Sequence, residues 1–183
     1  MPYISGSSEL EDGVPDVWFP IDHNLISWTS DPLTATGTYT LATAGTVYLV
    51  AIKTNATTIS NVVYNVTTAG STLTASQCFV GVYQNGALLG TSATTSTVWA
   101  STGLKTTALA SPVAVQAGYV YVAFFFNGTT GPTFSAGSTT LANVGLTAAQ
   151  SRFATGATGA TTALPGAPGT LTALAASPWV ALS

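Results

Sequence analysis

The sequence predicts an all-β protein, a jelly-roll-like antiparallel β-sandwich with an extended N-terminal arm. Residues 119–126 form the longest apolar run, and apart from Ala123 every residue in it is β-branched or aromatic. Similar short segments recur from residue 34 onwards, without helical periodicity between them. Glycine, asparagine and proline separate these segments at the spacing of turns, a pattern typical of sandwiches and jelly rolls.

The composition indicates one domain, or one domain plus an arm, in a chain of 183 residues. Hydrophobic residues make up 46% of the chain and charged residues only 5%, whereas about 25% charged is typical of soluble domains. Threonine, serine and asparagine supply the polarity instead. A surface with so little charge suits a protein whose faces are largely covered by other protein, or one exposed to a harsh medium.

The charge and hydropathy patterns exclude several classes of protein. The only basic residues are Lys53, Lys105 and Arg152, and three scattered cations cannot bind nucleic acid by releasing counterions. No apolar run is long enough to span a membrane as a helix. The first residues lack the basic and apolar regions of a signal peptide, so we expect synthesis in a cytoplasm. The single cysteine, Cys78, lies in a strand pattern and is predicted to be a buried structural thiol.

Residues 1–32 are predicted to form an acidic docking arm, and residues 33–183 to form the sandwich. All six carboxylate side chains of the chain lie in the arm, together with large apolar residues among prolines. Such a segment reads as an extended strap that docks on its own body or on a neighbouring subunit. The predicted interface residues of the arm are Glu9, Glu11, Asp12, Asp16, Trp18, Phe19 and Trp28. A metal site built from the acids and His23 is the alternative, but their spacing matches no metal-binding loop, so no metal is predicted.

The body is predicted to contain roughly eight to ten short strands, drawn from eleven candidate segments. The hairpin signal Asn85-Gly86 joins two of them through a type I′ turn, and residues 155–177, rich in Gly, Ala, Thr and Pro, are expected to form a long loop before the last strand. The expected strands are residues 37–43, 46–54, 60–68, 77–84, 87–91, 105–110, 112–116, 118–127, 139–143, 151–154 and 179–182.

The central strand is apolar on both faces. Alternation assigns Val120, Val122, Phe124 and Phe126 to the core, and places a second apolar row on the opposite face. A two-layer sandwich buries only one face of each sheet, so the second row needs another cover, either the arm or a symmetry mate. The predicted interface residues of this sheet face are Tyr119, Tyr121 and Phe125.

The body offers little catalytic chemistry. From residue 33 onwards there is no carboxylate side chain and no histidine, so general acid–base catalysis and a serine triad lack their groups. We find no nucleotide-binding motif, and the protein is predicted to be a non-enzyme without a cofactor. Trp99 or Phe134, if exposed on loops, could stack on sugars, although we expect Trp99 to pack at the edge of the core.

Several segments carry a resemblance to a known family. Residues 66–74, 77–83, 86–90, 99–106 and 117–123, with 152–155 and the ending 179–183, resemble a β-sandwich domain in virion proteins of tailed bacteriophages, particularly those of actinobacteria. The resemblance covers roughly residues 34–183. It implies a virion protein at the particle surface that contacts the major capsid protein or tail proteins and forms a homo-oligomer; trimers are suggested by threefold packing in such particles.

The resemblance leaves more than one role open. In that family the domain commonly belongs to long tail or fibre proteins, whereas here it stands almost alone behind a short arm. We therefore expect a capsid decoration protein that docks on the head through its arm. The alternative is a tail-tip or fibre module that recognises a host cell-wall glycan. A cellular lectin-like module is a third reading, which the expected lack of a signal peptide opposes.

Overall fold

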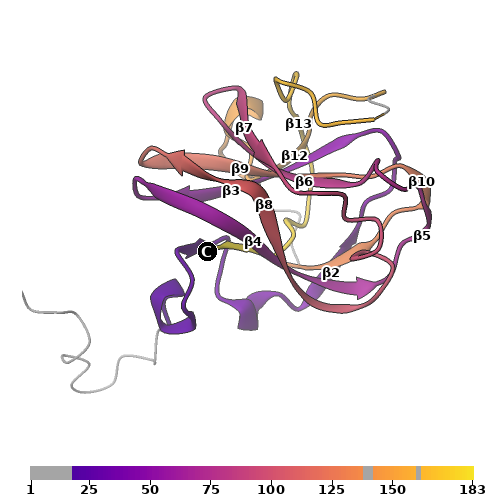
Figure 1. The fold of residues 1–183 in the computed structure, drawn as a ribbon. Helices are drawn as coiled ribbons and strands as arrows, with labels where there is room; N and C mark the ends of the chain where they lie inside the picture. The colour runs from indigo at the N-terminus through magenta and orange to yellow at the C-terminus, as the bar shows by residue number, and fades with distance from the viewer. Residues whose placement is uncertain (1–17, 138–141, 160–161) are drawn as a thin grey trace, which may run out of the picture.

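A computed structural model of the chain describes residues 18–137, 142–159 and 162–183. Two antiparallel six-stranded sheets pack face to face in this part of the chain, with a two-stranded sheet at one end (Figure 1). The all-β prediction is therefore confirmed, and the architecture is an antiparallel β-sandwich.

The first sheet, sheet A, has the order β1-β14-β4-β11-β2, with β8 paired to the other side of β4. Its strands are β1 (Ser27–Trp28), β2 (Gly37–Thr40), β4 (Thr57–Thr68), β8 (Gly103–Val115), β11 (Thr133–Ala136) and β14 (Val180–Leu182). The second sheet, sheet B, has the order β13-β12-β3-β9-β6-β7. Its strands are β3 (Val47–Thr54), β6 (Phe79–Gln84), β7 (Ala87–Thr91), β9 (Gly118–Phe125), β12 (Phe153–Thr155) and β13 (Thr172–Ala173).

The remaining elements are short. Strands β5 (Ser71–Leu73) and β10 (Gly128–Thr130) pair with each other. Three 3-10 helices complete the described chain: η1 (Pro20–His23), η2 (Pro32–Thr34) and η3 (Ala148–Gln150).

The predicted strands at residues 105–110 and 112–116 are one continuous strand, β8. Its pairing with β4 shifts register between Ile59, which faces Val113, and Asn61, which faces Ala108. Pro112 lies in this irregular stretch, where its missing N–H group removes no regular ladder bond. The short strands β1, β5, β10, β11 and β13 were not predicted, and the strand expected at residues 139–143 lies largely outside the described residues.

Two local predictions are confirmed. Asn85 and Gly86 both have positive φ, 53° and 77°, as a type I′ turn between β6 and β7 requires. Cys78 is fully buried, and its thiol lies within hydrogen-bonding distance of the Thr74 and Asn127 carbonyl oxygens. Burial raises the pKa of this thiol, which keeps it neutral and structural.

The main core lies between the two sheets. It contains Val120, Val122, Phe124 and Phe126, as predicted from strand alternation. Trp99 and Phe134 are also fully buried here, so neither is available to stack on a sugar. Trp99, Phe134 and Phe124 surround Tyr64 with ring centroids 5.2–6.5 Å from it. The Trp99 Nε1–H donates a 2.8 Å hydrogen bond to the Tyr64 hydroxyl oxygen, which satisfies the buried indole group.

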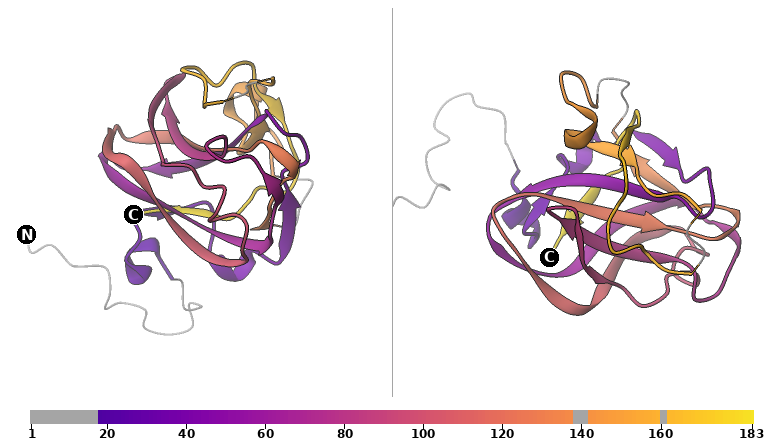
Figure 2. Two further views of the ribbon diagram at one scale, coloured as in Figure 1. Left: turned by 45° about the vertical axis from the view of Figure 1, so that its right-hand side comes forward. Right: turned by 90° about the horizontal axis from the view of Figure 1, so that it is seen from above.

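A second core lies on the outer face of sheet B, and the chain covers it by itself. Phe125 and Ala123 of β9 are fully buried there with Val47 and Leu49 of β3. The cover is the crossover segment, defined as residues 156–159 and 162–171, which Figure 2 shows running over the outer side of this sheet. Its residue Leu164 packs so closely above Gly81 that a Cβ atom at that glycine would clash with it.

Backbone hydrogen bonds tie the crossover segment to sheet B. The Val47 amide donates to the Ala157 carbonyl at 2.9 Å, and the Leu88 amide donates to the Gly166 carbonyl at 2.9 Å. The Tyr83 hydroxyl donates to the Pro165 carbonyl at 2.6 Å. The segment predicted as a long loop is therefore a fixed third layer. Neither the arm nor a symmetry mate is needed to bury Phe125.

Substituting Leu164→Ala tests this third layer. Leu164 is 6% exposed, so its truncation should lower the free energy of unfolding by roughly 2–4 kcal/mol. Denaturant unfolding measures the loss. The matched control is Leu33→Ala, because Leu33 is 83% exposed and its truncation should change stability by less than about 0.5 kcal/mol. Equal stability of the two variants would show that the crossover segment does not cover the sheet.

The buried phenol of Tyr83 predicts an alkaline loss of stability. Burial raises the pKa of Tyr83 from 10.0 to about 12. Between these values the unfolded chain loses the Tyr83 proton while the folded chain retains it, so ionisation stabilises the unfolded state. The free energy of unfolding should fall as pH rises from about 10 to about 12, and less steeply in Tyr83→Phe. Denaturant titrations across this range measure how the free energy of unfolding changes with pH. The difference between the two proteins at pH 8, where the phenol is protonated in both states, gives the cost of the lost hydrogen bond to Pro165. Parallel curves for the two proteins would contradict the assignment.

Candidate assembly interface

The described part of the arm docks on its own body. We use the term strap for residues 18–36. Strand β1 of the strap extends sheet A beside β14, with Ser27 opposite Leu182 and Trp28 opposite Ala181. The Ile26 amide donates to the Leu182 carbonyl at 2.7 Å and the Thr29 amide to the Val180 carbonyl at 2.9 Å. The sequence left open whether the arm docks on its own body or on a neighbouring subunit. The structure places residues 26–29 on the body of the same chain.

Trp179 anchors the strap on the outer face of sheet A. Its indole Nε1–H donates to the Ser30 carbonyl at 2.9 Å, and its ring packs with Val63 and Ala181. Leu25, Trp28 and Ala35 of the strap pack against this small cluster. Arg152, which directly precedes β12 of sheet B, also holds the strap: its Nη2 donates to the Thr29 carbonyl at 3.0 Å. The strap from Leu25 onwards is consequently part of the folded unit.

The two acidic residues of the strap cap its turns. Asp22 Oδ2 accepts a 2.8 Å hydrogen bond from the Phe19 amide at the start of η1. Asp31 Oδ1 accepts a 2.8 Å hydrogen bond from the Leu33 amide at the start of η2. Both are local N-terminal caps of the kind that shape short turns. The four predicted acidic interface residues, Glu9, Glu11, Asp12 and Asp16, all lie outside the described residues.

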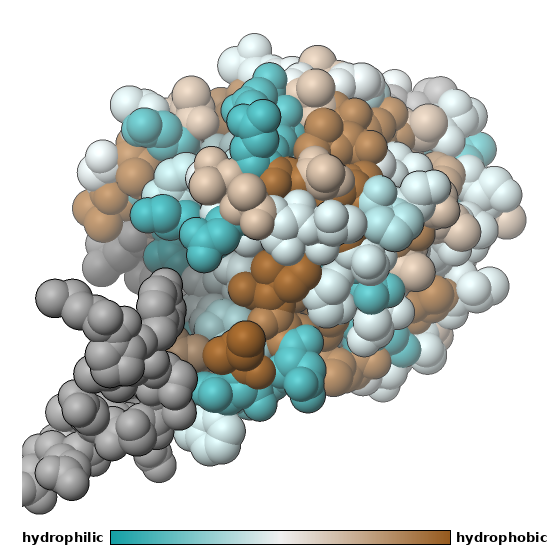
Figure 3. All heavy atoms as spheres, turned by 60° about the vertical axis from the view of Figure 1, so that its left-hand side comes forward, coloured by the Kyte–Doolittle hydropathy of each residue, from teal (hydrophilic) through white to brown (hydrophobic). Residues whose placement is uncertain are grey.

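The outward side of the strap exposes large apolar side chains. Trp18 is 51% exposed, Phe19 55%, Ile21 78% and Leu33 83%; the neighbouring Leu104 of β8 is 67% exposed. We call these five residues the strap patch. Ile21 lies in η1 and Leu33 in η2. Trp18 and Phe19 directly precede η1, and Leu104 lines the pocket described below. Figure 3 views the molecule from the side on which η1 lies, where apolar (brown) residues reach the surface in clusters. Clustered exposed apolar side chains mark interaction surfaces.

An aromatic stack fixes the base of the strap patch. The His23 ring lies between Trp18 and Trp28, with centroid distances of 5.4 and 5.3 Å and edge-to-face geometry. Trp28 in turn packs on the cluster around Trp179. Edge-to-face aromatic contacts add stabilisation beyond the buried area. The exposed Trp18 is thereby linked to the body through ring contacts.

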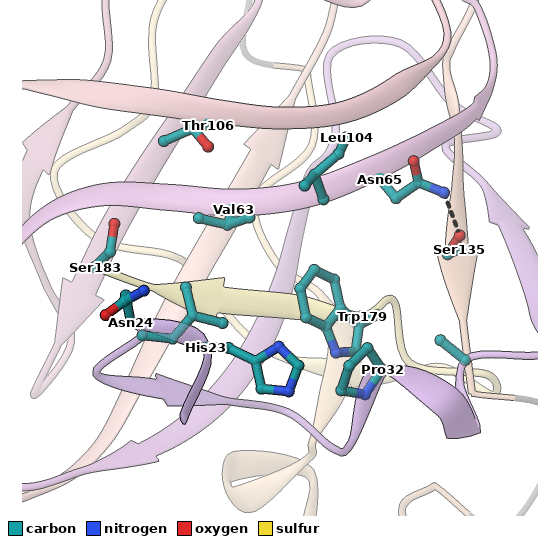
Figure 4. Close-up of a pocket in the computed structure, with 12 residues that line it drawn as sticks. His23, Asn24, Pro32, Val63, Asn65, Leu104, Thr106, Ser135, Trp179 and Ser183 are labelled. Carbon is teal, nitrogen blue, oxygen red and sulfur yellow. Dashed lines mark hydrogen bonds between the residues drawn. The ribbon is translucent and has the colours of Figure 1, made fainter. Parts of the chain in front are cut away.

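A pocket of about 520 Å³ lies between part of the strap and the outer face of sheet A. Figure 4 shows Trp179, His23 and Pro32 on one side of it and Val63 and Leu104 on the other. Neutral polar groups complete the wall, among them Asn65 and Ser135, which are joined by a 2.7 Å hydrogen bond. A largely apolar pocket of this size suits the side chains of a docking partner.

Sequence analysis did not identify the residues that the sandwich contributes to this pocket. Val63, Asn65, Leu104, Ser135 and Trp179 come from four separated segments, and only pairing of β4 with β8, β11 and β14 brings them together. The one available signal was Trp179, a tryptophan that follows Pro178 directly before the last strand. The predicted arm residue Trp28 does lie beside this site.

The predicted sheet-face interface requires a correction. Phe125 is fully buried by the crossover segment, so it has no surface to offer a partner. Tyr121 is half-buried, and its hydroxyl donates to the Ala149 carbonyl at 3.1 Å. Tyr119 alone remains well exposed, at 61%. The alternation correctly indicated a second apolar row, but the cover belongs to the same chain.

The described residues provide no group of three or more histidine, cysteine, aspartate or glutamate side chains suited to a metal ion. Within the same residues, no helix has the length and apolarity needed to cross a membrane. No protein-family model and no curated protein sequence matches the chain.

The variant Trp179→Phe tests the anchoring of the strap. Losing the hydrogen bond to Ser30 should cost about 1 kcal/mol and raise the hydrogen-exchange rates of the Ile26 and Thr29 amides roughly fivefold. Exchange followed by NMR reports each amide separately. The Val122 amide in β9 should keep its protection, and Val144→Ala, at an exposed site, should leave all these rates unchanged. Unaltered exchange at Ile26 and Thr29 would show that Trp179 does not hold the strap.

Proposed function

We propose that this protein is a non-enzymatic structural component of a tailed-bacteriophage particle, a capsid decoration protein that docks on the head surface. The observation that carries the proposal is the two-sided strap. Its inner side is fixed on sheet A through Trp28 and Trp179, while the strap patch on its outer side has no cover among the described residues. A fixed platform with uncovered apolar side chains suits permanent docking on another protein.

The chemistry of the strap patch supports a protein partner. Apolar anchors such as Trp18, Ile21 and Leu33 would insert into the shell, and the pocket beside Trp179 would receive a side chain in return. Aromatic and aliphatic anchors of this kind dominate binding energy at interfaces. The resemblance to phage virion domains supplies the setting, and the major capsid protein is the proposed partner. A trimeric arrangement on the particle is part of the same proposal.

The proposal is tested with the double variant Ile21→Asp, Leu33→Asp. Both side chains are highly exposed, so the variant should fold as the wild type does. Each burial is worth about 1.5–3 kcal/mol in an interface, and a carboxylate there adds a desolvation cost. The variant should bind particles that lack the protein at least about tenfold more weakly than the wild type. Co-sedimentation with such purified particles measures the binding.

The control for this experiment is Val144→Asp. Val144 is 72% exposed and lies outside the strap, so the substitution should leave particle binding intact. Wild-type protein that fails to co-sediment with particles, or a double variant that binds as well as the wild type, would contradict docking through the strap.

A further inference from the structure

A groove of about 600 Å³ lies on the outer side of sheet B, on the opposite face of the sandwich from the strap. Tyr119 and Tyr121 of β9 line it. Helix η3 supplies one wall, residues 168–171 supply another, and the turn at Asn85 completes the lining. The volume lies within the roughly 300–1,000 Å³ of small-ligand sites.

Tyrosine hydroxyls of sheet B hold the η3 wall and the part of the crossover segment that leads into the second wall. Tyr121 donates to the Ala149 carbonyl of η3 at 3.1 Å, and Tyr83 donates to the Pro165 carbonyl of the crossover segment at 2.6 Å. Sheet B therefore holds η3 and the crossover segment in place beside the groove. A ligand would bind to a preformed site and would not have to order these segments.

The free groups of the groove are aromatic and neutral. The residues lining it include no acidic, basic or histidine side chain. Tyr119 is 61% exposed. Within the described residues, the Tyr119 hydroxyl and the Asn85 side-chain amide form no hydrogen bond, and Gln150 uses only Oε1, which accepts from Thr147 at 3.2 Å. The groove therefore offers a ligand the ring and hydroxyl of Tyr119, the side-chain amide of Asn85 and the side-chain NH₂ group of Gln150.

We propose that this groove binds a neutral saccharide. A pyranose face carries polarised C–H groups that match the electron-rich face of an aromatic ring. Sugar hydroxyls both donate and accept hydrogen bonds, as do the Tyr119 phenol and the Asn85 amide. An anionic or cationic ligand would find no opposite charge in the lining, and its desolvation would be uncompensated.

A proline-rich peptide is the competing occupant, because such peptides also dock in grooves lined by aromatic residues. Prolyl segments offer carbonyl acceptors but no backbone N–H donors. They offer the side-chain carbonyl oxygen of Asn85 no backbone donor to replace water, whereas a sugar hydroxyl does. The hydrogen-bonding groups therefore favour the saccharide.

The test titrates the full-length protein with four neutral tetrasaccharides: maltotetraose, cellotetraose, α-1,6-mannotetraose and N-acetylated chitotetraose. At least one should bind with a Kd of about 1 mM or below, measured by calorimetry and NMR shifts. Tyr119→Ala should weaken that binding at least about tenfold, and Gln150→Ala by a smaller factor. Tyr119→Phe, which keeps the ring, should bind more tightly than Tyr119→Ala.

The controls separate the groove from the strap and from folding. Leu33→Ala, on the opposite face, should bind the sugar as the wild type does. Tyr119→Ala should unfold at the wild-type temperature because its side chain is largely exposed. The proposal is overturned if no tetrasaccharide binds at about 10 mM, if Tyr119→Ala leaves sugar binding unchanged, or if a proline decapeptide occupies the groove while the sugars do not.

Discussion

The burial of both faces of β3 and β9 is the constraint on which the structure depends. The inner faces form the core of the sandwich, but the outer faces carry Phe125 and Leu49, which a two-layer fold would leave in water. The crossover segment covers them, with Leu164 seated above Gly81. A stretch of small residues and prolines thereby becomes a third layer. Its residues 168–171 also form one wall of the groove on the outer side of sheet B.

The sequence predicted the elements whose signals are local and missed those that depend on distant partners. Alternation assigned Val122 and Phe124 to the core, and Asn85-Gly86 located the hairpin. The short β1 and the pocket around Trp179 depend on pairing between the two ends of the chain, which no local pattern encodes. Phe125 was assigned to an interface because the residues that cover it have low complexity and resemble a loop.

The two outer faces of the sandwich differ in chemistry. The strap lies on sheet A and presents tryptophan, phenylalanine and aliphatic side chains around an apolar pocket. Sheet B presents a groove in which one exposed tyrosine is bordered by amides. If the strap faces a particle, the groove faces the medium. The near absence of charge agrees with this arrangement, since one face is proposed to be covered by protein and the other to interact through neutral groups.

The most direct test of the central claim, docking through the strap, is electron cryo-microscopy of phage particles that carry this protein. We predict density for the β-sandwich on the head surface, with β1 and η1 toward the shell and the tip of the β6–β7 hairpin turned outward. Density at the tail tip, or sandwiches whose strap points into solvent, would contradict the account.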